Sequence, residues 1–180
     1  TGVDMARMKA EVLYQKAKKH GVGLRQRLVA ELPRYAQYAA RAGGLIALRD
    51  RFGPVAALSE RMLGFSRRRS LPSFAKRPFR DEEARFCGDG DKPPVMLFAD
   101  TFGRWFDPGT LRAAVDVLSA GGYTVETAVP VDGGTRPLCC GRTYIAAGML
   151  DRARAEAKRM LAALGPHIAR GGVVVGLEPS

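Results

Sequence analysis

Two adjacent cysteines, Cys139 and Cys140, are the residues whose types and spacing most clearly indicate chemistry. They lie in the run Pro-Leu-Cys-Cys-Gly-Arg at residues 137–142. Neighbouring thiols form a disulfide with each other only under strain. Two thiolates from one turn can, however, bind the same metal ion or cluster, and Gly141 allows the backbone to approach closely. The alternative from the residue types alone is a pair of small core residues, because cysteine is readily buried.

The sequence around the cysteines predicts alternating strands and helices. Three short apolar runs indicate strands, at residues 95–99, 123–129 and 173–177. A helix is expected between the first two runs, from Asp107–Pro108 to Gly121–Gly122. A longer helical region follows the cysteines. This β-α-β-α-β order predicts an α/β fold with a parallel sheet and right-handed crossovers.

Polar or thiol side chains follow each predicted strand. Asp100 and Thr101 follow the first strand, Cys139 and Cys140 the second, and Glu178 the third. Sites in parallel sheets lie beyond the carboxyl ends of the strands. We therefore expect these residues to cluster at one sheet edge, with Cys139 and Cys140 as metal ligands. Asp100 and Glu178 are the candidate additional ligands.

The segment from about residue 95 to 180 resembles the cysteine-rich CCG domain of iron–sulfur oxidoreductases. That family includes one subunit of heterodisulfide reductase and the iron–sulfur subunit of glycolate oxidase. The similarity is closest to the C-terminal region of FAD-linked oxidases of the D-lactate dehydrogenase type. The matching runs are Leu-Phe-Ala-Asp-Thr-Phe at 97–102, Leu-Cys-Cys-Gly-Arg at 138–142 and Gly-Leu-Glu-Pro-Ser at 176–180. Residues 1–5 also resemble the stretch after the last Cys-Pro of a two-cluster ferredoxin segment.

The resemblance implies a C-terminal fragment of a larger FAD and iron–sulfur oxidoreductase that transfers electrons from the oxidation of a 2-hydroxy acid. It implies FAD and 4Fe-4S clusters in flavin and ferredoxin-type domains outside this chain, which would be its partners. It also implies an iron–sulfur cluster or zinc at the CCG site of the complete protein. No residue of this chain is assigned to FAD, and the fragment itself is expected to be inactive. The hydroxy acid and the electron acceptor are left open.

The chain departs from the family pattern in its thiols. The wider family has a cysteine after the first strand, where this sequence has Thr101, and a further cysteine is expected immediately after Ser180. The third cysteine, Cys87, is interpreted as an incidental loop thiol. Clusters and closed zinc sites normally use four ligands. For this chain alone we therefore expect the site to be empty; if it binds a metal, we expect zinc rather than an iron–sulfur cluster.

The sequence of residues 1–65 predicts a helical segment. In the parent protein this segment is expected to follow a ferredoxin-type region that is not part of this chain. Helices are indicated at about residues 5–20, from 24 to the glycines at 43–44, and at 55–63. Asp4 can cap the first helix, and Pro33 should kink or split the second. A short apolar turn is expected after Gly43–Gly44.

A basic and glycine-rich linker is predicted at residues 66–93, before the CCG-type α/β domain at 94–180, which is truncated at its C-terminal end. Two prolines break its basic part, residues 66–80, and Phe74 and Phe79 are expected to anchor it against a folded neighbour. Residues 1–86 carry 19 basic and 8 acidic side chains, whereas residues 87–180 carry 10 of each. The whole net charge of +11 therefore lies in the helical segment and linker.

This charge suggests a second class of function, a non-catalytic docking or structural module that binds an acidic partner. A basic region with interleaved phenylalanine can also bind nucleic acid or anionic lipid, but no nucleic-acid-binding signature is present. The sequence has no apolar run of transmembrane length and no signal peptide. A reducing cytoplasmic location is expected, and peripheral association with the inner face of a membrane is left open.

Overall fold

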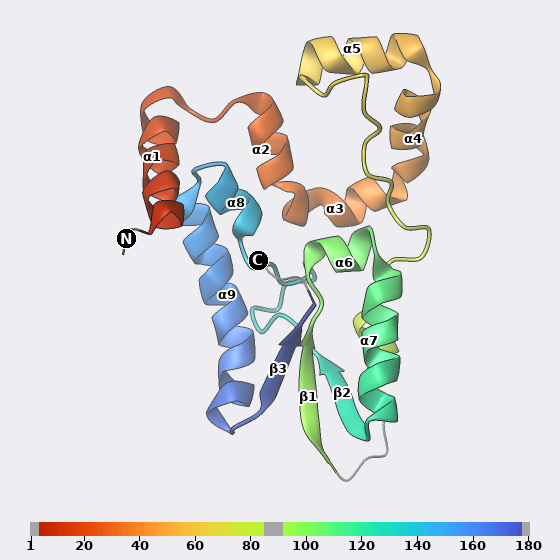
Figure 1. Cartoon of the computed structure of the whole chain (residues 1–180), viewed down its shortest axis with the longest axis vertical. Coiled ribbons are helices and arrows are strands. Elements are labelled where there is room, and N and C mark those ends of the chain that lie inside the picture. The colour runs from red at the N-terminus through yellow and green to blue at the C-terminus, as the bar shows by residue number, and fades with distance from the viewer. Residues whose placement is uncertain (1–3, 85–91, 178–180) are drawn as a thin grey trace. The chain divides into compact units, whose positions relative to one another are not determined.

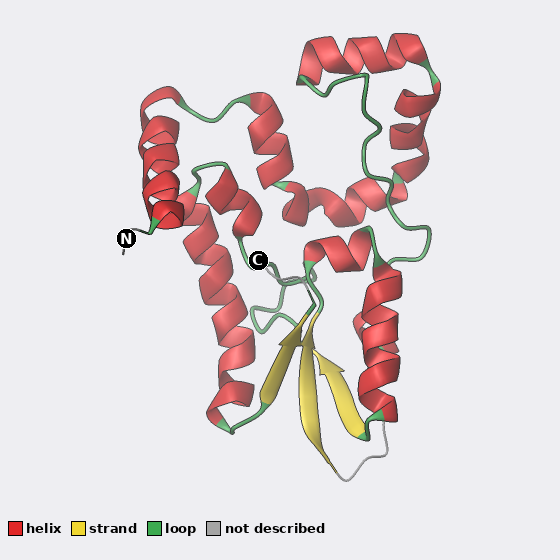
Figure 2. Ribbon diagram, in the orientation of Figure 1, coloured by secondary structure: helices red, strands yellow, loops and turns green. Residues whose placement is uncertain are grey.

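The computed structural model describes residues 4–84 and 92–177 of the 180-residue chain. Within these residues the chain forms helices and one three-stranded sheet (Figure 2). Its contacts divide it into two compact units. We call them the helical unit, residues 1–73 and 141–156, and the sheet unit, residues 74–140 and 157–180.

The sheet is parallel. Its strands are β1 (Lys92–Phe98), β2 (Tyr123–Thr127) and β3 (Val173–Gly176), in the order β2-β1-β3. In the central strand β1, Val95 aligns with Val125 on one side and with Val173 on the other. The predicted α/β fold class, with a parallel sheet preceded by helices, is therefore confirmed.

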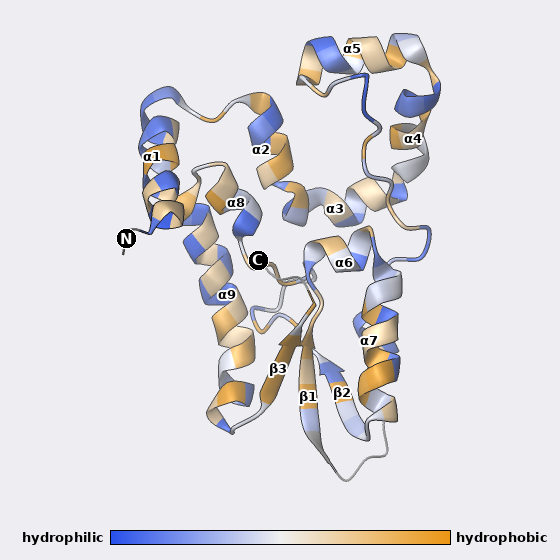
Figure 3. Cartoon of the chain, in the orientation of Figure 1, coloured by the Kyte–Doolittle hydropathy of each residue, from blue (hydrophilic) through white to orange (hydrophobic). Residues whose placement is uncertain are grey.

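Helices cover both faces of this sheet (Figure 1). After β1 come α6 (Thr101–Trp105) and α7 (Pro108–Ala120), and α9 (Leu150–Ala169) precedes β3. Because side chains alternate across a strand, β1 contributes Leu97 to the core with α7, and Met96 and Phe98 to the core with α9. Figure 3 shows the hydrophobic character of β3, which is buried between these layers only in part.

The helical unit begins with five helices: α1 (Met5–His20), α2 (Leu24–Ala30), α3 (Leu32–Arg41), α4 (Gly43–Arg51) and α5 (Gly53–Leu63). As predicted, Asp4 caps α1, where its side chain accepts a 3.0 Å hydrogen bond from the N–H of Arg7. Pro33 lies in the first turn of α3 and separates it from α2, as its lack of an N–H requires. No helix of the described residues is long and apolar enough to cross a membrane.

The turn predicted after Gly43–Gly44 is wrong, because these residues begin the nine-residue helix α4. This helix follows α3 directly, because Ala42 is both the C-cap of α3 and the N-cap of α4. Glycine destabilises a helix mainly in its interior, through the loss of backbone entropy, and these two glycines stand in the first turn of α4. The glycine pair therefore marks a change of helix rather than a loop.

Residues 141–156 complete the helical unit through α8 (Arg142–Ala146) and the start of α9. Tyr144 is buried with Ala30 and Ala153, and its hydroxyl donates to the Glu31 carboxylate at 3.0 Å. Glu31 also forms an ion pair with Arg152. The sequence prediction had no signal for this grouping, since these contacts join residues more than a hundred positions apart. The predicted domain limits at 65 and 94 stay a prediction.

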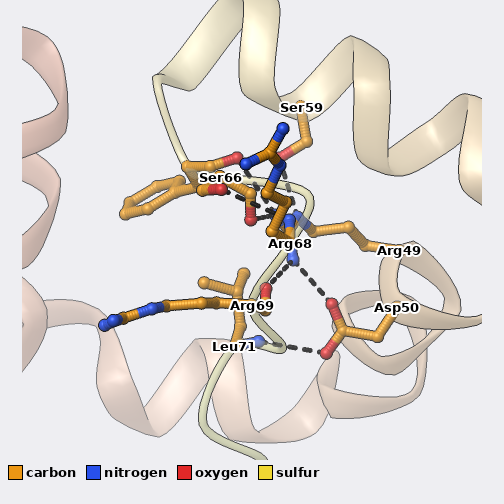
Figure 4. A network of polar contacts seen from close by, with 8 residues as sticks. Arg49, Asp50, Ser59, Ser66, Arg68, Arg69 and Leu71 are labelled. Atoms are coloured by element: carbon orange, nitrogen blue, oxygen red, sulfur yellow. Dashed lines mark hydrogen bonds and ion pairs between the residues drawn. The ribbon is translucent and has the colours of Figure 1, made fainter.

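The chain after α5 has no regular secondary structure up to residue 80, and its arginine-rich start is strongly hydrophilic (Figure 3). Its first part is nevertheless held by Arg49, whose side chain is only 6% exposed (Figure 4). The guanidinium donates to three main-chain carbonyls and two side chains: Phe65 at 3.0 Å, Ser66 at 2.7 Å, Arg69 at 3.2 Å, Ser59 Oγ at 3.1 Å and Asp50 Oδ1 at 2.6 Å. We call this set the Arg49 network.

The later part of this segment belongs to the sheet unit and is anchored by its phenylalanines, as predicted. Phe79 is buried in the core shared with α7. The Phe74 ring lies 4.6 Å from the ring of Phe106. The buried Arg104 donates to the Phe79 carbonyl at 3.2 Å and pairs with Asp81 at 2.6 Å. Residues 81–91 were predicted as part of the linker, and of these 85–91 lie outside the described residues.

Replacing Arg49 by methionine should destabilise the helical unit by about 3 kcal/mol, because several buried acceptors and the Asp50 carboxylate lose a charged donor. Urea unfolding measures this loss, and amide exchange of residues 65–71 should become faster. The matched control is the exposed Arg51→Gln variant, for which we expect a change within about 0.5 kcal/mol. Equal effects of the two substitutions would show that the Arg49 network does not hold the segment.

Gly148 is expected to tolerate no side chain. Its φ of +72° disfavours L residues, and an added Cβ would lie 2.3 Å from the main-chain oxygen of Leu13. Gly133 has the same φ but open space around it. Gly133→Ala should therefore cost only the backbone term of about 1 kcal/mol, whereas Gly148→Ala should cost more than about 2 kcal/mol. Thermal unfolding of both variants tests the difference, and similar losses would contradict the close approach of α1 to Gly148.

Candidate functional site

The two cysteines lie in the loop between β2 and α8, residues 128–140, which we call the cysteine loop. Leu138 is 2% exposed and packs with Ala128 and Leu164 in the core on the α9 face of the sheet. Cys139 is buried and Cys140 is half-buried. The apolar residue before the cysteines therefore inserts into the core and sets the position of the thiols after it.

Arg159 of α9 holds the same loop by its main chain. Its guanidinium donates to the carbonyls of Arg136 and Pro137, the latter at 2.9 Å, and it pairs with the Asp132 carboxylate. The hydrogen bond from Arg159, together with one from the N–H of Gly134, holds the pKa of Asp132 below its usual range. Sequence reasoning missed this arginine, because no local pattern links a helical arginine to carbonyls more than twenty residues earlier.

The glycine after the cysteines has a structural reason. Gly141 has φ +84°, and an added Cβ would lie 3.0 Å from the main-chain oxygen of Ala153. The main chain at Gly141 therefore lies close to the first turn of α9, and its expected close approach to a metal or cluster stays a prediction. The carbonyl of Gly141 then accepts hydrogen bonds from the N–H groups of Tyr144 and Ile145 and starts α8.

Asp100, the first candidate additional ligand, lies directly after β1 and caps α6. Its Oδ1 accepts hydrogen bonds from the N–H groups of Phe102 at 2.6 Å and Gly103 at 3.1 Å. Thr101 is the buried first residue of the same helix. An aspartate at this position is explained by capping alone, so its presence gives no separate indication of a metal.

A cavity of about 320 Å³ opens beside this cap in the sheet unit. It is lined by residues of α6 and α7, by the two aspartates Asp100 and Asp107, and by Leu177 after β3. The cavity thus lies at the carboxyl ends of β1 and β3, where a parallel sheet places its sites. Glu178, the second candidate additional ligand, comes after Leu177 and lies outside the described residues.

The described residues do not complete the ligand set of a cluster or of a closed zinc site. Over residues 4–84 and 92–177, no three His, Cys, Asp or Glu side chains are arranged to hold one metal ion. Asp100, Cys139 and Cys140 do not form such a group. Cys87 lies outside the described residues, like Glu178. Cys139 and Cys140 stay the predicted ligands, with Asp100 and Glu178 as candidate additional ones.

Replacing Asp132 by asparagine should loosen the cysteine loop at pH 7, because the charged partner of Arg159 is lost. The folded-state pKa of Asp132 is lowered, so its contribution is present above the ordinary aspartate pKa and disappears as the pH falls through the lowered value. Amide-exchange protection of residues 133–140 should therefore be smaller in Asp132→Asn at pH 7, and the two proteins should converge in acid. Asp116→Asn, at an exposed position on α7, is the matched control. A difference in amide-exchange protection between the wild type and Asp132→Asn that does not change with pH would contradict this role of Asp132.

Chemically, the site offers two adjacent thiols beside a buried core, and among the described residues these cysteines form no disulfide. Thiolates are soft ligands that suit zinc, copper(I) and iron–sulfur clusters. Two of them can supply part of a redox or metal centre whose other ligands come from elsewhere. No protein-family model, curated protein or solved structure matches this chain.

Proposed function

We propose that this chain is an electron-transfer part of a larger FAD and iron–sulfur oxidoreductase, of the D-lactate dehydrogenase or glycolate oxidase type, which oxidises a 2-hydroxy acid. Its contribution is the pair of thiols Cys139 and Cys140. The proposal rests on the resemblance to the CCG domain, carried by the runs at 97–102, 138–142 and 176–180. The partners are then the flavin and ferredoxin-type domains of the same protein.

The observation that supports this function most directly is the way the thiols are held. Leu138 is buried in the core and Arg159 donates to the preceding carbonyls, so the buried Cys139 and the half-buried Cys140 lie in a loop that is held on its N-terminal side. A preorganised pair of ligands loses less conformational entropy when it binds than a mobile pair does. Such order is expected of a ligand pair.

Two thiols do not suffice for a four-ligand centre, so the chain's own role is limited to supplying and positioning them. Thr101 is a poor replacement for the family's cysteine, because its hydroxyl stays protonated at neutral pH. The 180-residue chain by itself should therefore be folded, colourless and inactive with 2-hydroxy acids.

Cobalt(II) provides a direct test, because thiolate ligands give it intense charge-transfer absorption in the near ultraviolet. We expect the chain, purified without oxygen and then saturated with added cobalt(II), to show this band, and Cys139→Ser and Cys140→Ser each to weaken it by about half or more, since each removes one of two thiolates. Cys87→Ser is the matched control and should leave the band unchanged. A band that depends equally on Cys87, or no thiolate band at all, would contradict the proposed ligand pair.

Iron and sulfide analysis of the same preparation addresses the missing ligands. A brown protein with stoichiometric iron and sulfide would contradict the expectation of a colourless chain. It would show that ligands besides Cys139 and Cys140 complete a cluster in this preparation. The sheet and helices bury apolar cores without a metal, so chelation should leave the circular dichroism spectrum unchanged.

A second candidate function is a non-catalytic docking module for an acidic partner. It is favoured by the charge of residues 1–86 and by five large apolar side chains that α4, α5 and the residue between them expose: Leu48, Phe52, Val55, Leu58 and Met62. Under this alternative, replacing both Cys139 and Cys140 by serine would leave electron transfer in the complete parent protein intact. Under the first proposal the same double variant would abolish it.

A further inference from the structure

A groove of about 580 Å³ lies within the helical unit, between α2, α8 and the segment after α5. Its volume falls in the range of about 300–1,000 Å³ that is typical of small-molecule sites. None of its lining residues belongs to the cysteine loop. The groove therefore shares no residue with the cysteine loop. A ligand site in the groove does not depend on the proposed electron-transfer function.

The groove has an apolar part and a basic part. The apolar part is formed by Val29, Phe65, Leu71, Ala146 and Ala147. Two arginines, Arg25 of α2 and Arg69 of the segment after α5, line it as well, together with neutral polar residues and Gly64. No carboxylate is among the lining residues. A ligand that matches this lining needs an apolar body and a negative charge.

The guanidinium groups of both arginines have donors to spare. Arg69 makes no side-chain hydrogen bond or ion pair with any described residue, and Figure 4 shows its side chain extending away from the Arg49 network. Arg25 donates one long hydrogen bond, 3.4 Å, to the carbonyl of Gly64. Each guanidinium has five N–H donors in a fork that fits carboxylate and phosphate, so both can receive an anion.

The groove walls are fixed before any ligand binds. On one side, the buried Arg49 donates hydrogen bonds to the carbonyls of Phe65, Ser66 and Arg69. These bonds order the segment that carries the Arg69 side chain. On the other side, the hydroxyl of Thr143 donates to the Ala30 carbonyl at 2.9 Å and ties α8 to α2. A groove with walls held in this way binds with a smaller entropic cost than one that must form around its ligand.

We propose that this groove binds a small organic anion that has one carboxylate or phosphate head and an apolar body. The head pairs with Arg25 and Arg69, and the body covers the apolar residues of α2 and α8. The surrounding charge favours this choice over a neutral or cationic ligand, since all of the +11 net charge lies in residues 1–86. A free small molecule is favoured over a membrane surface, because the lining residues form a concavity rather than a protruding apolar face.

Titration of the ¹⁵N-labelled 180-residue chain with monomeric sodium decanoate, monitored by amide chemical shifts, tests the site. Saturable shifts are expected for Val29, Leu71 and Ala146. Decyl phosphate should act like decanoate, because the two heads share the same pairing chemistry. Decanol lacks the charge, decyltrimethylammonium has the opposite charge and inorganic phosphate lacks the apolar body, so all three should leave these amides unshifted.

Matched arginine variants locate the head group. Arg25→Gln and Arg69→Gln should each weaken decanoate binding about fivefold, the amount expected for losing one partly exposed ion pair. Arg27→Gln on the same helix and Arg67→Gln in the same segment remove an equal charge outside the groove, and should change the affinity less than about twofold. Circular dichroism of all four variants establishes that they are folded.

Three results would overturn the proposal. If the four variants weakened decanoate binding equally, the binding would depend on the general positive charge and not on the two arginines of the groove. Shifts confined to other parts of the chain, or no saturable shift, would show that the groove does not take this ligand. Binding to anionic vesicles with none to monomeric decanoate or decyl phosphate would assign the basic surface to a membrane instead.

Discussion

Arginine side chains that donate to main-chain carbonyls hold the irregular segments of this protein in place. Segments without helix or strand have carbonyls that no ladder satisfies, and one guanidinium can satisfy several of them at once. Arg49 does so for residues 65–69, Arg112 for residues 77 and 78, and Arg159 for residues 136 and 137. Each arginine also pairs with a carboxylate, from Asp50, Glu83 or Asp132. The carboxylate offsets the cost of removing the cation from water.

Both candidate sites depend on this device. The cysteine loop is fixed by Arg159 at the residues that directly precede Leu138, and the groove of the helical unit has one wall fixed by Arg49. Arg49 is not among the residues that line the groove. Each arginine acts by ordering a neighbouring stretch of backbone, which then places a thiol or a second guanidinium.

Local patterns in the sequence were sufficient for most of the helices and strands. Asp4 and Pro33 act through their immediate neighbours, so their effects on α1 and α3 could be predicted from residue type. The alternation of apolar runs and helical periodicity likewise predicted the parallel sheet. Helix α4 was missed because a glycine pair in isolation favours a turn or a helix end, whereas here Ala42, which ends α3, is also the N-cap of α4. The grouping of α8 with α2 depends on contacts between distant residues, such as Thr143 with Ala30, and no local signal carries it.

The candidate site was predictable in part for the same reason. The cysteines, Gly141 and the residues after each strand could be identified from type and spacing. The partners of the arginines could not, because a guanidinium recognises carbonyls, which every residue has. Asp100 shows the converse limit: a carboxylate after a strand was interpreted as a candidate ligand, and in the structure one of its oxygens is engaged as a helix cap.

Recognition of the main chain has a consequence for how this sequence can vary. A guanidinium that binds carbonyl oxygens places no demand on the side chains of the loop it holds, so residues 67, 68, 136 and 137, which do not line the groove, can change while the path of the main chain is retained. The arginine has no such freedom. Lysine would keep the charge but concentrates its donors at one point, and it cannot span two or three separate carbonyls. We therefore expect the residue types of these loop positions to vary, whereas the arginines on the helices that hold the loops stay arginine.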